Sequence, residues 1–102
     1  MSTLTSFEWD EAKAAANFAK HGVRFEHARA AFNDPFAIEW FDDRFDYGEE
    51  RCSLLGMANE RLLFVAFLDR GDIIRLISAR GAEPHERRRY YEENGRRGEP
   101  LN

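Results

Sequence analysis

The sequence has very little cysteine and no long apolar run. Cys52 is the one cysteine among 102 residues, so no disulfide can form within the chain and a cysteine-rich zinc or iron–sulfur framework is excluded. No apolar stretch approaches the roughly 18 residues that a membrane-spanning helix needs. Residues 1–5 carry neither a basic segment nor an apolar run of signal-peptide length. We therefore expect a cytoplasmic protein that does not engage a membrane.

Motifs for metal binding, covalent catalysis and phosphate-binding loops are also missing. The histidines are His21, His27 and His85, and no two have the i, i+4 spacing of a helical zinc site. No nucleophile elbow surrounds Cys52 or Ser78, and the chain has no glycine-rich phosphate loop. The sequence thus predicts no metal and no cofactor.

Lysine is scarce and the net charge is negative. Only two of the 15 basic residues are lysines and the net charge is −4, which speaks against nucleic acid as a partner. The charges are segregated, however: residues 34–50 hold seven acids and one base, whereas residues 75–97 hold seven arginines and four glutamates. The planar fork of arginine suits phosphate, so this distribution favours an anionic partner. A solvated, salt-bridged surface is the alternative.

Periodicity and turn signals predict a single α+β domain over residues 1–102. Two N-terminal helices are expected over 9–20 and 25–32, and a C-terminal helix over 83–94. Strands are expected over 38–41, 51–57, 61–68 and 73–79, and their short connections imply a four-stranded antiparallel meander. The third of these strands is apolar on both faces, so it should be central. The last helix is too polar for deep burial, and the tail 96–102 should be loose.

Two arginines stand on the strand expected over 73–79. Regular alternation would place Arg75 on the same face as Ile77 and Arg80 on the opposite face. An arginine within an apolar strand is costly unless it is paired. Arg75 must therefore meet a carboxylate or line a hydrated surface.

The last helix adds groups that can move protons. Glu86 and Tyr90 are one turn apart. Metal-free RNA cleavage uses the ribose 2′-hydroxyl as the nucleophile, so a protein must accept one proton, donate another and stabilise the added negative charge. Glutamate or tyrosine can transfer protons, and arginine can stabilise the phosphorane. A lattice of arginine–glutamate pairs that only holds the helix on the sheet is the alternative, and spacing leaves both open.

Several motifs, in order along the chain, resemble the BrnT toxin family. They are Phe7-Glu8-Trp9-Asp10, Lys13, Asn17, Lys20-His21-Gly22-Val23, Phe25-Glu26-His27-Ala28, Gly48-Glu49-Glu50-Arg51, Leu54-Leu55-Gly56, and the run from Arg75 through Arg80 to Glu86, Arg87 and Tyr90. The resemblance covers residues 7–92. It implies a RelE-like fold and a ribonuclease toxin of a type II toxin–antitoxin pair, which cleaves RNA and arrests translation and growth.

The resemblance also implies residue roles and partners. Residues expected to act in catalysis are Arg75, Arg80, Glu86 and Tyr90. Residues expected to bind the RNA substrate are Lys20, His21, Arg51 and Arg87, although helix capping explains the first two about as well. The implied partner is a BrnA-type antitoxin whose ribbon-helix-helix part binds DNA, in a heterotetramer of two toxins and two antitoxins. A non-catalytic module of the same fold that binds protein or nucleic acid is the alternative.

Overall fold

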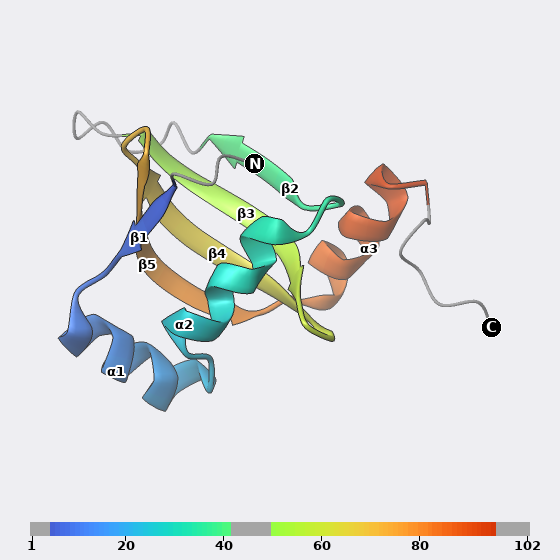
Figure 1. The fold of residues 1–102 in the computed structure, drawn as a ribbon. Coiled ribbons are helices and arrows are strands. Elements are labelled where there is room, and N and C mark those ends of the chain that lie inside the picture. Colours follow the sequence, from blue (N-terminus) through green and yellow to red (C-terminus); the bar gives the residue numbers. More distant parts are fainter. Residues whose placement is uncertain (1–4, 42–49, 96–102) are drawn as a thin grey trace.

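The computed structural model describes residues 5–41 and 50–95, in which five strands form one sheet and helices pack against both of its faces (Figure 1). The expected loose tail lies outside these residues. The elements in chain order are β1 Ser6–Glu8, α1 Glu11–His21, α2 Phe25–Ala28, the 3-10 helix η1 Arg29–Asn33, β2 Ile38–Phe41, β3 Glu50–Ala58, β4 Arg61–Asp69, β5 Ile73–Gly81 and α3 Pro84–Glu93. Among them, no helix is long and apolar enough to cross a membrane.

The strand order is β1-β5-β4-β3-β2, and β2 to β5 form the expected antiparallel meander. The expectation of four strands was wrong, because β1 adds a fifth strand, parallel to β5. Its three residues are too few to show the period-two alternation of a strand, and Phe7 pairs with a residue 67 positions further along the chain, Ile74. Sequence periodicity therefore gave no signal for it.

The second expected helix is also different in the structure. Its α-helical part ends at Ala28, and residues Arg29–Asn33 continue as a tighter 3-10 helix. This segment lies directly on β3, where a Cβ atom added to Gly56 would come within 2.7 Å of the Ala31 carbonyl oxygen. Glycine at position 56 thus permits the close approach of the η1 backbone to the sheet.

Hydrophobic side chains fill both faces of the sheet. We call the face under α1, α2 and η1 the α1 face, and the opposite face, which α3 covers at one end, the α3 face (Figure 1). The α1 face holds the larger cluster, with Phe25, Val65 and Phe67 fully buried. The smaller cluster on the α3 face joins Leu55 and Leu62 to Tyr90 of α3. As expected, β4 is the central strand, covered on both sides.

A β-bulge in β5 changes the direction of its side chains. The register passes from Ala66↔Ser78 to Phe67↔Leu76, so Ile77 is an extra residue. Leu76 and Ala79, an odd number of residues apart, therefore both belong to the core of the α1 face. For the same reason Arg75 and Arg80, opposite Leu68 and Phe64 respectively, both lie on the α3 face. The expectation that the two arginines occupy opposite faces was wrong.

Asn17 of α1 protects the edge of β5 beyond the short strand β1. Its side-chain amide donates to the Ala79 carbonyl oxygen at 2.9 Å, and its Oδ1 accepts from the Ala79 amide at 3.1 Å. A third hydrogen bond, 3.0 Å long, runs from the same amide group to the Val23 carbonyl oxygen. The side chain thus replaces a neighbouring strand at Ala79 and holds α1 on the sheet.

Candidate functional site

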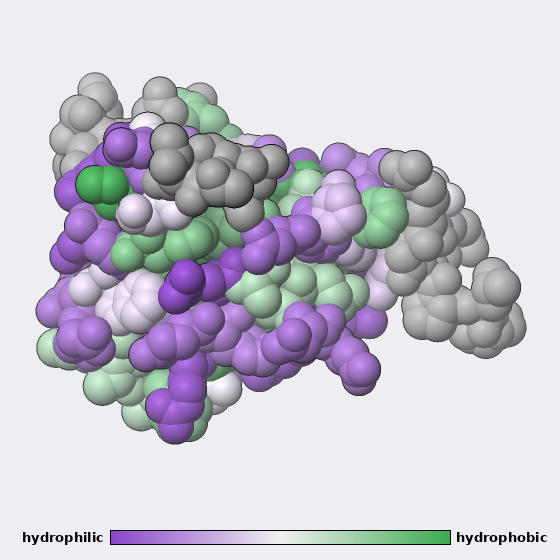
Figure 2. Space-filling model, viewed as in Figure 1, coloured by the Kyte–Doolittle hydropathy of each residue, from purple (hydrophilic) through white to green (hydrophobic). Residues whose placement is uncertain are grey.

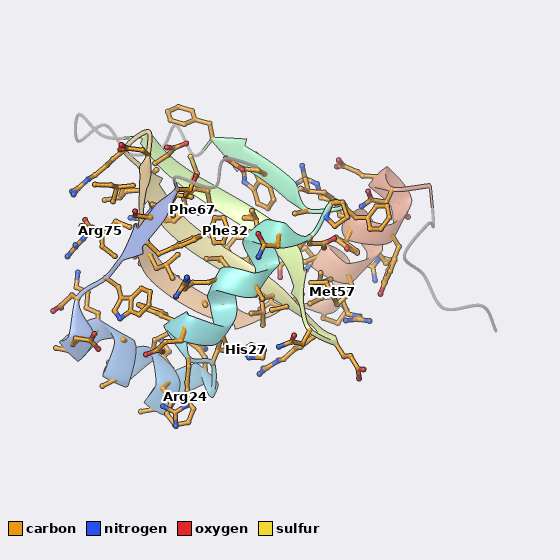
Figure 3. The ribbon with its side chains drawn as sticks, viewed as in Figure 1. Arg24, His27, Phe32, Met57, Phe67 and Arg75 are labelled. Carbon is orange, nitrogen blue, oxygen red and sulfur yellow. The ribbon has the colours of Figure 1, made fainter. Side chains whose placement is uncertain are left out.

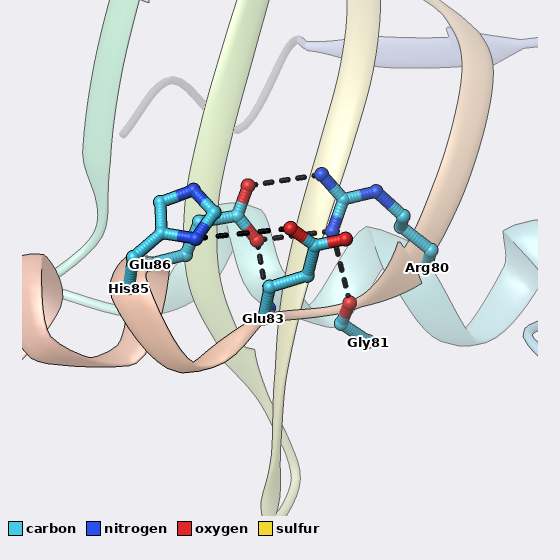
Figure 4. Close-up of polar contacts among 5 residues, drawn as sticks. All are labelled: Arg80, Gly81, Glu83, His85 and Glu86. Atoms are coloured by element: carbon cyan, nitrogen blue, oxygen red, sulfur yellow. Dashed lines mark hydrogen bonds and ion pairs between the residues drawn. The ribbon is translucent and has the colours of Figure 1, made fainter.

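Arg80 and Glu86 face each other where β5 ends and α3 begins (Figure 4). Pro84 begins α3, a position where its missing N–H costs nothing, and Glu86 stands at the third helical position. The Arg80 Nη1 and Nη2 atoms each donate to one Glu86 carboxylate oxygen at 2.9 Å. The Glu83 backbone amide donates to the same carboxylate at 2.8 Å. The carboxylate therefore accepts three hydrogen bonds while 8% of the residue is exposed.

These contacts set the charge state of the pair. Burial alone would raise the pKa of Glu86, but the hydrogen bonds from Arg80 and the Glu83 amide, with the positive charge of Arg80, outweigh it and lower the pKa. The hydrogen bond to Glu86 raises the pKa of Arg80 in turn. The Arg80 guanidinium also lies 4.4 Å from the centre of the Phe64 ring and donates to the Gly81 carbonyl oxygen at 3.1 Å. Both groups are charged at neutral pH.

His85 stands beside this pair and was not among the residues that the sequence indicated. It is exposed, with its Nδ1 atom 3.7 Å from a carboxylate oxygen of Glu83 (Figure 4). Histidine can accept or donate a proton near neutral pH. The signal that could have found it is its position, one residue before Glu86 at the start of a helix that follows an arginine-bearing strand.

Two groups of potential metal ligands occur among the described residues. One consists of Glu83, His85 and Glu86, and the other of Glu39, Cys52 and Asp69; in each group the ligand atoms lie within 4.8 Å of one another. In the first group the Glu86 carboxylate already accepts three hydrogen bonds. In the second, burial and the nearby charge of Asp69 raise the pKa of Glu39, so proton binding competes with metal binding there.

Tyr90 lies one turn after Glu86 but is 1% exposed. Its hydroxyl donates to an Asp34 carboxylate oxygen at 2.5 Å, and burial together with this hydrogen bond raises the pKa of Tyr90 well above its ordinary value. The same Asp34 oxygen accepts from the Met57 amide at 2.8 Å. Asp34 therefore ties α3 to β3, and the geometry of Tyr90 is that of a residue that positions the helix.

Arg75 lies on the same face as Arg80 but at the other end of β5. Its guanidinium donates to Glu8 at 3.1 Å, and Arg70 donates to the same carboxylate oxygen at 3.0 Å. Arg75 and Arg80 pair with Leu68 and Phe64 of β4, which are four residues apart. This is a separation of about 13 Å along the strand, at roughly 3.3 Å per residue. Of the two environments expected for Arg75, the structure shows the carboxylate partner, and it does not bring Arg75 next to Glu86.

The residues expected to bind substrate lie in three places. Arg51 of β3 is opposite Leu68, so it shares the α3 face with Arg75. Lys20 and His21, at the end of α1, line a shallow pocket of about 260 Å³ beside Ser78 of β5. Arg87 is exposed on α3, with its guanidinium 5.8 Å from the centre of the Tyr91 ring.

On the α3 face, a row of uncharged side chains separates Arg75 and Arg51 at one end from Arg80 at the other. Ser53, Ala66 and Ser78 lie opposite one another on three neighbouring strands, and Trp40 ends the row on β2. Arg75 and Arg80 therefore stand on either side of this row, and Arg89 of α3 lies over its Trp40 end, 4.6 Å from the centre of the ring. Such an arrangement fits a chain with negative charges spaced along it.

The fold and site together define a small α+β domain with an arginine–carboxylate site at the junction of a sheet and its last helix. A family model described as "Ribonuclease toxin, BrnT, of type II toxin-antitoxin system" matches residues 9–86. The chain belongs to this BrnT family of ribonuclease toxins, and membership in a type II system implies an antitoxin partner. No curated protein matches the chain.

Proposed function

We propose that this protein is a metal-independent endoribonuclease whose RNA cleavage arrests translation and growth in the cytoplasm. The observation that carries the proposal is the two-hydrogen-bond pair of Arg80 and Glu86 with His85 beside it. These side chains supply an anion-binding fork, a carboxylate base and a second proton-transfer group within a few residues. The family supports the reaction class.

The pairing of Arg80 with Glu86 suggests how substrate activates the base. A phosphate that takes the fork of Arg80 would remove two of the three hydrogen bonds that the Glu86 carboxylate accepts. Burial, which raises the pKa of Glu86, would then dominate, and the carboxylate would bind a proton more strongly. Glu86 thus becomes a better general base when the substrate phosphate arrives.

The reaction follows from these roles. Glu86 accepts the proton of the ribose 2′-hydroxyl, and the 2′ oxygen attacks the adjacent phosphorus. Arg80 stabilises the added negative charge on the phosphorane. The bond from phosphorus to the 5′ oxygen then breaks while His85 donates a proton to that oxygen. The products are a 2′,3′-cyclic phosphate and a 5′-hydroxyl end, and no step requires a metal.

Other residues bind and position in this proposal. Arg75 and Arg51 contact phosphates further along the strand, with Glu8 displaced from Arg75 by the RNA. Lys20, His21 and Arg87 bind substrate at the margins of the site. Tyr90 acts as a positioning residue through Asp34, because its hydroxyl is buried and already donates a hydrogen bond. A BrnA-type antitoxin with a ribbon-helix-helix part that binds DNA is the proposed partner.

Incubation of the purified chain with RNA tests the proposal. We expect cleavage in the presence of a chelator, with 2′,3′-cyclic phosphate ends, and roughly 100-fold slower cleavage by Arg80→Lys, which keeps the charge but loses the planar fork. Arg70→Lys, changed at a surface pair with Glu8, is the matched control and should cleave like the wild type. Activity that a chelator abolishes and magnesium restores would contradict the metal-independent reaction.

The second candidate is a non-catalytic module in which the arginines seat a protein. The observation that favours it is that Arg75 and Arg80 are already paired with carboxylates, as in a lattice that holds the fold together. In that case RNA would stay intact, and Arg80→Lys would lower the melting temperature without any catalytic effect.

A further inference from the structure

A second group of basic residues gathers where the α1–α2 connection meets the start of β4. Arg24, His27 and Arg61 line a shallow pocket of about 280 Å³ together with Phe18. We call these four residues the basic corner. Figure 3 shows Arg24 and His27 near each other at the α1–α2 end of the molecule, far from Arg75. In the space-filling view, hydrophilic side chains are mixed with weakly hydrophobic ones over the α1–α2 end of the molecule (Figure 2).

The arginines of the basic corner differ from Arg75 and Arg80, the two strand arginines of the α3 face, in having no acidic partner. Arg70, Arg75, Arg80 and Arg89 each donate to a glutamate at 2.8–3.1 Å. Within the described residues, neither Arg24 nor Arg61 has a carboxylate within 4.0 Å. In a chain of net charge −4, two guanidinium groups left unneutralised in one pocket leave a local site for an anion.

An aromatic ring lies within the same pocket. The Arg24 guanidinium stands 4.1 Å from the centre of the Phe18 ring, and Phe18 is 42% exposed. Most large apolar side chains of the described chain are buried or half-buried, so the exposure of Phe18 is unusual. Exposed aromatic rings next to cations are the features with which proteins hold single-stranded nucleic acid, because bases stack on the ring while arginines meet phosphates.

The basic corner is continuous with the Arg80–Glu86 site through one residue, Gly81. A Cβ atom added to Gly81 would lie 2.9 Å from Arg61 Nη2, so glycine allows this guanidinium to lie against the backbone of β5. The carbonyl oxygen of the same residue accepts a hydrogen bond from Arg80. Gly81 pairs with Leu63, which belongs to the α1 face, and Arg80 pairs with Phe64, which belongs to the α3 face. The guanidinium groups of Arg61 and Arg80 therefore lie on opposite faces at the same end of the sheet.

We propose that the basic corner is a second binding subsite for the RNA strand, which passes from Arg80 around the end of β5 to Arg61 and Arg24 and stacks a base on Phe18. The inference rests on the proposed ribonuclease function and adds a path for the strand beyond the cleaved bond. It gives long RNA an affinity that a short substrate confined to the Arg80 site lacks.

Binding of a fluorescent single-stranded RNA tests the path. The probe is a long oligouridine with 2′-O-methyl riboses, which lacks the attacking hydroxyl and stays intact. Arg24→Gln/Arg61→Gln should bind it roughly tenfold more weakly, and the slope of log affinity against log salt should shrink by about 1.4, or about 0.7 for each lost phosphate contact. Cleavage of an unmodified trinucleotide should stay at the wild-type rate.

The matched control is Arg29→Gln/Arg70→Gln. It changes the net charge equally at two arginines on the β1 side, where Arg29 lies over Phe7 and Arg70 pairs with Glu8. It should bind the probe like the wild type, and thermal melting should show that both double variants fold. Equal losses in both variants would overturn the subsite, since net charge alone would then explain them.

Two further outcomes separate the subsite from the enzyme. In the first, the wild type cleaves RNA, and Arg24→Gln/Arg61→Gln keeps full affinity for the probe but loses affinity for the antitoxin. The basic corner would then bind protein, and only the inference of an RNA subsite would be wrong. If the wild type neither binds the probe nor cleaves the trinucleotide, the proposed ribonuclease function is wrong and the subsite with it.

Discussion

At the scale of single residues, Arg80 sets the charge state of Glu86 in the free protein. Burial and hydrogen bonding act on its pKa in opposite directions, and the contacts with Arg80 decide the sign in the free protein. A carboxylate held ionised in this way stabilises the fold at neutral pH, because the unfolded chain offers it no such partner. In the proposed reaction, the same pair would therefore contribute both to the stability of the protein and to the binding of substrate.

Replacing Glu86 with glutamine should therefore make the stability less sensitive to acid. The folded pKa lies below the ordinary value of 4.5, so the stabilisation is complete above pH 4.5 and is lost as the pH falls through the folded pKa. Urea denaturation at a series of pH values should show a steeper fall in the free energy of unfolding for the wild type than for Glu86→Gln below pH 4.5. Glu92→Gln, at an exposed position of the same helix, is the control and should show the wild-type dependence of the free energy of unfolding on pH. Parallel curves for Glu86→Gln and the wild type would show that the pair does not stabilise the fold.

Some of the contacts among the candidate residues could be predicted from the sequence. Arg80 and Glu86 are six residues apart across a strand–helix junction, so local reasoning and the family motif both bring them together. The partners of the other two expected catalytic residues are distant: Glu8 is 67 residues from Arg75, and Asp34 is 56 residues from Tyr90. Local spacing cannot indicate such pairs, because they depend on how β1 and η1 are placed in the fold.

At the scale of elements, the edge of β5 is shared between a strand and a side chain. β1 pairs with residues 73–75 of β5, and Asn17 makes hydrogen bonds with both backbone groups of Ala79. Unpaired strand edges invite association with other chains. Asn17 thus protects the part of the edge that lies next to Arg80.

Replacement of Asn17 with alanine should cost about 2–4 kcal/mol in the free energy of unfolding, because it leaves the Ala79 amide and two carbonyl groups without their partner at a buried position. Asn17→Asp should also destabilise the fold, since it keeps the acceptor for the Ala79 amide but loses both donors. Urea denaturation measures both effects. Lys13→Ala, on the exposed side of the same helix, is the control and should change the free energy of unfolding by less than about 0.5 kcal/mol. An equally small effect of Asn17→Ala would refute the role of Asn17 at the edge of β5.

The meander and the three helical regions could be predicted because turns and periodicity are local. The bulge in β5 could not, since the run from Leu76 to Ser78 carries no glycine or proline that would mark an extra residue. One such residue moves every side chain after it to the other face. The assignment of Arg75 and Arg80 to opposite faces failed for this reason.

At the scale of the whole molecule, paired and unpaired charges have different distributions. Arg75 and Arg80 of the α3 face are paired with glutamates of the same chain, whereas Arg24 and Arg61 of the basic corner have no carboxylate partner among the described residues. Four of the seven acids in the stretch 34–50 lie outside the described residues. A partner with carboxylates would meet the corner directly, but on the α3 face it would have to replace Glu8 or Glu86.

Binding of the antitoxin should bury the junction of β5 and α3. An arginine fork that suits phosphate also suits a carboxylate, so an antitoxin helix with acidic side chains can occupy the place of the RNA. Hydrogen exchange on the complex should show slower exchange at residues 80–90 than in the free protein, and association should slow as salt is raised. Native mass measurement should give two toxins and two antitoxins, the closed twofold assembly. Protection confined to residues 34–50, with Arg80 and Glu86 still exchanging freely, would mean that the antitoxin does not act by covering the site.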